Sequence, residues 1–139
     1  MTSGFELFDH TADLGVRAHA SSLPELVAPC TEGLYAVVGD VVAGDDGSAW
    51  SFESAGDDPA VLLRDYLAEV LLLFEQEHQR LTGVHVLEFG DSRLHVVASA
   101  CPVDTERSAY HREVKAVTYH ELAVRQAGEG YEATYIVDI

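Results

Sequence analysis

A long amphipathic stretch in the middle of the chain constrains the fold more than any other feature. Between Asp58 and Arg80, apolar residues recur at helical spacing and form a broad face. Asp58 is a good N-cap residue and Pro59 a good first helical residue, so the sequence marks where this helix begins. Its apolar run is far shorter than the ~20 residues that span a bilayer, which favours a core helix and no membrane contact. The apolar face consists of Leu62, Leu63, Tyr66, Leu67, Val70, Leu71, Leu73 and Phe74.

Most of the remaining chain predicts strands, with one further helix. That helix opens at Leu23-Pro24, with Ser21 or Ser22 as its N-cap, and ends near Gly39. Residues 83–100 alternate on both sides of a turn and predict a hairpin. The other expected strands are Phe5–Phe8, Leu14–Ala20, Trp50–Ser54, Glu113–Tyr119, Leu122–Gln126 and Tyr131–Ile139.

This order of elements predicts an α+β fold. We expect two layers, with the two main helices packed on a mixed, largely antiparallel sheet. The sequence has no internal repeat or linker, and 139 residues are enough for one domain with its own core. We therefore expect a single domain over residues 1–139.

Acidic residues strongly outnumber basic ones. There are 24 Asp and Glu against 8 Lys and Arg, which gives a formal net charge of −16. Such a surface repels phosphate groups, so we expect no tight direct binding of nucleic acid. It suits a protein that meets a basic partner or collects cations. Solubility alone explains the charge equally well.

Cysteine usage and the N-terminus favour the cytoplasm. Cys30 and Cys101 are isolated, without the spacing of a metal site or a redox pair. Two such thiols are typical of a reducing compartment. The first residues lack the basic region and apolar run of a signal peptide, so we expect a cytoplasmic protein.

Two acidic motifs near the ends of the chain are the best candidates for chemistry. Asp13 lies where a polar loop turns into an alternating strand, and Asp138 is the neighbour of the terminal carboxylate of Ile139. Anions that close repel each other unless a cation or protons lie between them. Oxygen ligands of this kind favour Ca²⁺ or Mg²⁺. The commoner role of such acids is a solvated surface, and the sequence alone does not bring residues 13 and 138 together.

The chain resembles the archease family in three motifs, in its length and in the order of its elements. The motifs are DHTADLGVRA from Asp9, EVKAVTYHEL from Glu113 and the terminal IVDI from Ile136. The resemblance covers essentially the whole chain, and the three motifs in this order are specific.

The resemblance implies an accessory protein rather than an enzyme. Archeases activate the GTP-dependent RNA-splicing ligase that joins 2′,3′-cyclic-phosphate or 3′-phosphate ends to 5′-hydroxyl ends in tRNA splicing or RNA repair. They promote guanylylation and multiple turnover of that ligase. The family's metal site corresponds to Asp13, Asp138 and Ile139, with Ca²⁺ or Mg²⁺ as the ion. A further family acid corresponds to Asp58 or its neighbour Asp57, and a plain N-cap role for Asp58 stays equally open.

Four residues in the motifs are candidates for supporting roles. His10 and His120 could join Asp13 in a zinc-type set, or orient the loops through hydrogen bonds, which is the commoner role. Lys115 and Thr118 are expected on opposite faces of their strand. Lys115 could neutralise part of the acidic site or contact a partner, and a surface salt bridge fits it as well.

Two other functions remain as alternatives. A metal-dependent phosphoester hydrolase acting alone needs cationic groups around its substrate, and this chain has 8 Lys and Arg and no glycine-rich phosphate loop. A structural, chaperone-like module is the other alternative. It predicts that replacing Asp13 or Asp138 leaves function intact.

Overall fold

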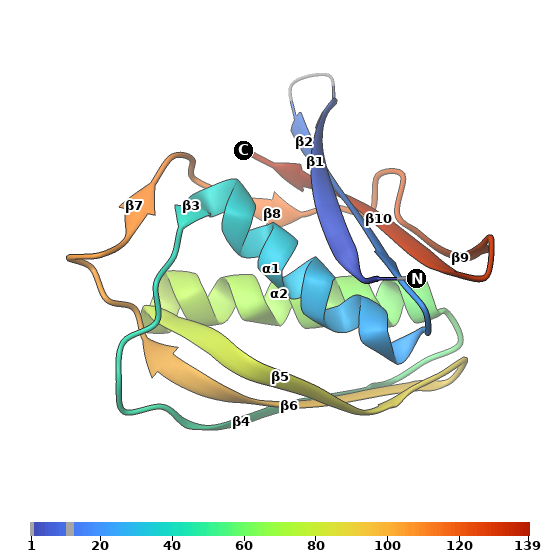
Figure 1. Cartoon of the computed structure of the whole chain (residues 1–139), viewed down its shortest axis with the longest axis horizontal. Coiled ribbons are helices and arrows are strands. Elements are labelled where there is room, and N and C mark those ends of the chain that lie inside the picture. The colour runs from blue at the N-terminus through green and yellow to red at the C-terminus, as the bar shows by residue number, and fades with distance from the viewer. Residues whose placement is uncertain (1, 11–12) are drawn as a thin grey trace.

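The protein is described here by a computed structural model of residues 2–10 and 13–139, with His10 represented by its backbone alone. Within these residues, all strand pairings are antiparallel. Figure 1 shows the two helices between a five-stranded sheet and a three-stranded sheet. The α+β class and the packing of both helices on antiparallel sheets are therefore confirmed. The strands are divided between separate sheets, where a single, partly parallel sheet was expected.

The five-stranded sheet joins the two ends of the chain. Its order is β1-β2-β10-β8, and β9 also pairs with β10. The first and last long strands, β2 and β10, are therefore neighbours. The strands are β1 (Gly4–His10), β2 (Asp13–Ala20), β8 (Ala116–Val117), β9 (Ala123–Ala127) and β10 (Gly130–Asp138).

The middle of the chain forms the other sheets. A three-stranded sheet has the order β4-β6-β5, and β5 and β6 are the hairpin expected around residues 83–100. A short two-stranded sheet pairs β3 with β7. The strands are β3 (Gly39–Asp40), β4 (Ser48–Ala55), β5 (Gln79–Phe89), β6 (Arg93–Pro102) and β7 (Ala109–Tyr110).

The two helices form where the sequence predicts them, with shifted ends. A 3-10 turn, η1 (Pro24–Leu26), leads into α1 (Val27–Val38). Leu23 takes the N-cap position in place of a serine, and the Ser22 hydroxyl accepts a 3.4 Å hydrogen bond from the Glu25 amide just outside it. Gly39, with φ of 145°, ends α1 because this conformation suits glycine.

The central helix, α2 (Pro59–Glu77), begins as expected and ends earlier. His78 takes a left-handed conformation with φ of 54°, so Gln79 and Arg80 start β5 instead of extending the helix. Because its apolar face is broad, α2 contacts strands of both larger sheets as well as α1. No helix in the described residues combines the length and apolar character that crossing a membrane requires.

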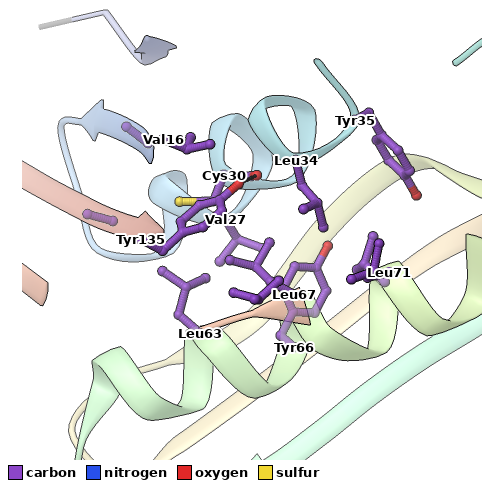
Figure 2. Close-up of a cluster of buried hydrophobic side chains, with 14 of the residues drawn as sticks. Val16, Val27, Cys30, Leu34, Tyr35, Leu63, Tyr66, Leu67, Leu71 and Tyr135 are labelled. Carbon is purple, nitrogen blue, oxygen red and sulfur yellow. Dashed lines mark hydrogen bonds between the residues drawn. The ribbon is translucent and has the colours of Figure 1, made fainter. Parts of the chain in front are cut away.

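Three buried tyrosines connect α1 to the rest of the core (Figure 2). Tyr135 of β10 donates a 2.7 Å hydrogen bond to the Cys30 carbonyl, and the Tyr35 hydroxyl accepts one of 2.9 Å from the Leu81 amide. The Tyr66 hydroxyl of α2 lies 2.8 Å from that of Thr31. Burial raises the pKa of all three phenols, that of Tyr35 to about 12. These satisfied polar contacts hold α1, α2 and β10 in one arrangement.

Candidate functional site

The strand register brings the two acids at the ends of the chain together. β2 and β10 pair antiparallel from Ala20 and Tyr131 to Leu14 and Val137. One step further, Asp13 lies opposite Asp138. Directly opposed residues share a face and have Cβ atoms typically about 4.5–5.5 Å apart. Figure 1 shows the end of β10 beside the β1–β2 hairpin, so the pair lies at one edge of the molecule.

Apolar alternation fixes this register. Leu14 and Val16 of β2, and Tyr135 and Val137 of β10, all point into the core and are at most 6% exposed. A slip of one residue would turn these side chains out into water, so the register is strongly specified. The same alternation places Asp13 and Asp138 on the opposite face, where Asp138 is exposed.

An aromatic cover protects that opposite face next to the acids. Gly15 and Ile136 are register partners, and the Phe8 ring lies over Gly15 so closely that a Cβ there would overlap it. Ile136 is fully buried although it points away from the core. The Arg17 guanidinium lies 4.5 Å from the centre of the Phe8 ring. Sequence reasoning missed this cover, and the glycine inside an alternating strand was its signal.

A third strand runs beside Asp138. The Lys115 amide donates a 2.8 Å hydrogen bond to the Asp138 carbonyl, and the Lys115 side chain is exposed. Its ammonium group has no ion pair with the described residues. Strand pairing here covers only Ala116–Val117, where a strand over Glu113–Tyr119 was expected. The difference arises because β10 ends at Asp138 and leaves residues 111–114 without a partner strand in this sheet.

Thr118 and His120 follow β8 and shape the loop after it. The amide and the hydroxyl of Thr118 both donate to the Ile136 carbonyl, each at 2.9 Å. The His120 amide donates a 3.1 Å hydrogen bond to the Thr118 hydroxyl. Thr118 is therefore a structural residue that ties this loop to β10.

Arg64 fastens β8 to the central helix. Its Nε donates a 2.9 Å hydrogen bond to the Val117 carbonyl, and its guanidinium lies 4.4 Å from the centre of the exposed Tyr119 ring. Arg64 thereby helps to hold the strand that lies against Asp138.

Asp58 lies apart from the other candidate acids. Its carboxylate accepts a 3.0 Å hydrogen bond from the Ala60 amide, which confirms the N-cap role. Lys115, beside Asp138, lines a hollow together with Leu72 of α2. Leu72 follows Asp58 by 14 residues, and this length of helix spans about 20 Å. Asp58 is therefore well separated from the part of α2 that lies beside Lys115. The structure does not bring it to Asp13 and Asp138.

His10 is the remaining candidate in this region. Its backbone is the register partner of Asp13 in the β1–β2 hairpin, so His10, Asp13 and Asp138 follow one another across three adjacent strands. The His10 side chain lies outside the described residues.

The donors at this edge fit part of the coordination shell of a hard cation. Asp13 and Asp138 offer carboxylates on one face, and the main chain of Ile139 adds oxygen next to them. Within residues 2–10 and 13–139, no group of three His, Cys, Asp or Glu side chains is placed to hold a metal ion. Mg²⁺ is commonly held by one or two carboxylates and keeps several waters, so two carboxylates suit a shared or water-rich site rather than a closed cage.

Comparison with known proteins agrees with this fold. The model of the "Archease protein family (MTH1598/TM1083)" matches residues 5–139. Protein archease of Methanopyrus kandleri is 30% identical over 138 residues, which cover 97% of this chain and 99% of that relative. Protein archease of Thermococcus gammatolerans is 31% identical over 139 residues, or 97% of this chain and 98% of the relative.

Two solved structures have the same arrangement. The solution structure of Methanobacterium thermoautotrophicum protein 1598 is 29% identical, covers 98% of this chain and 99% of its own, and superposes with a TM-score of 0.74. The crystal structure of an archease from Thermotoga maritima, named a possible chaperone, covers 96% of both chains with a TM-score of 0.68. At 19% identity, the latter likeness concerns the fold alone. By its family match over nearly its whole length, this chain belongs to the archease protein family.

Proposed function

We propose that this protein is an accessory factor that activates a GTP-dependent RNA ligase joining 2′,3′-cyclic-phosphate or 3′-phosphate ends to 5′-hydroxyl ends. The observation that carries the proposal is the register of β2 and β10, which pairs Leu14 with Val137 and, continued by one residue, sets Asp13 opposite Asp138 at an exposed edge. The same two acids correspond to the metal site expected from the resemblance to archeases.

The proposed functional site is the carboxylate pair of Asp13 and Asp138, with a main-chain oxygen of Ile139 as a further ligand. We propose that it holds Ca²⁺ or Mg²⁺, alone or together with groups of the ligase. Such an ion, when bound, supplies positive charge that stabilises phosphoryl or nucleotidyl transfer. The chain's own residues orient the donors, and the exposed Lys115 beside Asp138 offers a cation for a phosphate or an acidic group of the partner.

The charge of the chain supports a protein partner rather than direct RNA binding. A net charge of −16 repels an RNA backbone but speeds encounter with a basic protein surface. The name of the Thermotoga maritima relative, a possible chaperone, keeps a chaperone-like module as the alternative. The two functions differ in whether Asp13 and Asp138 are needed.

The test is multiple-turnover RNA ligation with the cognate 3′-phosphate ligase, GTP and a divalent ion. A substoichiometric amount of this protein should raise the number of turnovers, and Asp13→Ala should remove the stimulation. Asp91→Ala, a change of the same size in the exposed turn between β5 and β6, is the matched control and should stimulate like the parent. Absence of stimulation by the folded parent protein would reject the activator function. Full stimulation by Asp13→Ala would favour the chaperone-like alternative.

Calorimetry tests the ion separately. Asp13→Ala and Asp138→Ala should each lower the affinity for Ca²⁺ or Mg²⁺ by at least tenfold, since even outer-shell partners of a metal site contribute about 10–100-fold. Deleting Ile139 should also weaken binding, because it moves the main-chain oxygens. If both alanine variants bind the ion as tightly as the parent, the metal assignment is wrong.

A further inference from the structure

An apolar groove lies away from the acidic edge, where α1 ends, α2 completes its last turns and the chain passes through β7. The groove has a volume of about 590 Å³. Figure 1 shows β7 and the last turns of α2 near the left end of the molecule. Ligand sites in proteins commonly fall between about 300 and 1,000 Å³. We call it the α2 groove. Its apolar lining residues are Val38, Leu71, Phe74, Tyr110 and Val114.

The groove has a buried floor and an aromatic wall. Val38, Leu71 and Val114 are at most 6% exposed, so the floor is firmly packed. Phe74 and Tyr110 meet edge to face, with ring centres 5.6 Å apart and an interplanar angle of 85°. Tyr110 is 54% exposed. Exposed aromatic rings beside a hollow are enriched in protein interfaces.

Two glutamates give the groove negative charge. Glu75 of α2 and Glu113 both line it, and neither has an ion pair with the described residues. Partial burial, followed by the charge of Glu113, raises the pKa of the Glu75 carboxyl. The negative charge of Glu113 therefore acts on Glu75, and a cation between the two carboxylates would relieve their repulsion.

One basic side chain of the groove, Arg112, is held against the end of α1. Nη1 of Arg112 donates a 3.0 Å hydrogen bond to the Val37 carbonyl in the last turn of α1. His78 and His111 are the other titratable side chains of the lining.

We propose that the α2 groove binds an arginine side chain carried by an extended segment of a basic protein partner. The guanidinium would lie between Glu75 and Glu113, and its aliphatic stem would pack against Phe74 and Tyr110. Arginine suits such a site because its planar cation pairs with carboxylates and also packs on aromatic rings.

The surroundings favour a protein segment over a small amine. A second hollow adjoins the groove through Leu71 and Glu75 and extends past the exposed Leu72 to Lys115. This path offers room and apolar contacts for uncharged residues that flank the arginine, because Arg64 and Lys115 also line it. The net charge of −16 would draw a basic chain to the surface. The inference goes beyond the activator function, because it uses no residue of the Asp13–Asp138 pair and can be measured without a ligase.

The probe is a fluorescein-labelled, capped heptapeptide with a central arginine flanked by leucine and glycine. The matched control peptide carries citrulline, which has the shape of arginine without its charge. Binding is followed by fluorescence anisotropy with the full chain. The variants are Glu75→Gln and Glu113→Gln, and the control variant is Glu129→Gln in the exposed β9–β10 turn, which removes the same charge elsewhere. Thermal melts check that each variant is folded.

The arginine peptide should bind and the citrulline peptide should bind at least tenfold more weakly. Glu75→Gln or Glu113→Gln should weaken arginine binding about tenfold, which corresponds to 1.4 kcal/mol, whereas Glu129→Gln should change it less than twofold. Equal losses in all three variants would show nonspecific attraction to an acidic surface and overturn the proposal. Equal affinity of free arginine amide and the peptide would overturn the assignment to a protein partner.

Discussion

The molecule carries two pairs of like-charged carboxylates, and they are held in different ways. Asp13 and Asp138 project from adjacent strands whose register is fixed by a row of buried side chains. Glu75 projects from the last turns of α2, and Glu113 belongs to residues 111–115, which have no assigned helix or strand. One pair is positioned by backbone hydrogen bonds, and the other by the packing of a helix against an irregular segment.

This difference assigns the two pairs different tasks. Ligands on paired strands keep nearly constant separation, which suits an ion that requires defined geometry. Carboxylates on a helix and a loop adjust more easily, which suits a flexible side chain from a partner. Perturbing either pair should therefore leave the other unchanged.

The largest loss of stability is expected from crowding at Gly15, on the strand that carries Asp13. Gly15→Ala places a methyl group against the Phe8 ring, so the ring must move away from β2. Overpacking of this kind typically costs about 1–3 kcal/mol of unfolding free energy. Urea denaturation measures it. Gly90→Ala, where an added Cβ meets no atom within 4 Å, is the control.

The same variant separates the two regions functionally. Gly15→Ala should weaken ion binding at Asp13 and Asp138 and leave peptide binding in the α2 groove unchanged. A normal unfolding free energy for Gly15→Ala would contradict the aromatic cover.

A smaller loss is expected from Tyr135, which anchors the strand that carries Asp138. Tyr135→Phe removes the 2.7 Å hydrogen bond to the Cys30 carbonyl inside the core. Losing such a bond should lower the unfolding free energy by about 1–2 kcal/mol. Tyr131→Phe, on the same strand but partly exposed, should change it by less than about 0.5 kcal/mol. If the two variants are equally stable, Tyr135 does not anchor β10 as described.

The smallest effect concerns Glu75, which lies beside Glu113, and it depends on pH. Since the pKa of Glu75 is raised in the folded state, its ionised form is disfavoured there. The folded protein thus binds more protons than the unfolded chain between the two pKa values, and stability falls as pH rises through that window. Glu75→Gln should be more stable than the parent at pH 7, by at most about 0.5 kcal/mol because the side chain is largely in water.

Below pH 4 this advantage should disappear, because the parent carboxyl is then protonated in both states. Thermal unfolding of parent and variant at pH 7 and pH 3.5 gives the comparison. Glu129→Gln should show no such change with pH. A Glu75→Gln variant that is less stable than the parent at pH 7 would mean that the carboxylate has a favourable partner.

The family resemblance pointed to Asp13 and Asp138 as one site, whereas Glu75 and Glu113 were missed for a physical reason. Alternation in Leu14–Ala20 and Tyr131–Ile139 is a local signal, and the family resemblance joined these strands before their pairing was seen. Glu75 lies on the polar side of the predicted helix, where a charged residue gives no signal of a site. The groove beside it depends on how residues 111–114 pass the helix. The predicted strand, Glu113–Tyr119, covers only part of this segment, whose path is set by long-range packing. The division of the strands between two larger sheets was missed for the same reason.

The most direct measurement of the central claim is a double-mutant cycle in the multiple-turnover ligation assay. Asp13→Ala, Asp138→Ala and the double variant are compared for the stimulation they give. If the two carboxylates form one site, each single variant should lose most of the stimulation. The double variant should then lose no more stimulation than the more strongly impaired single variant. Losses that multiply in the double variant, or full stimulation by either single variant, would contradict a shared site at Asp13 and Asp138.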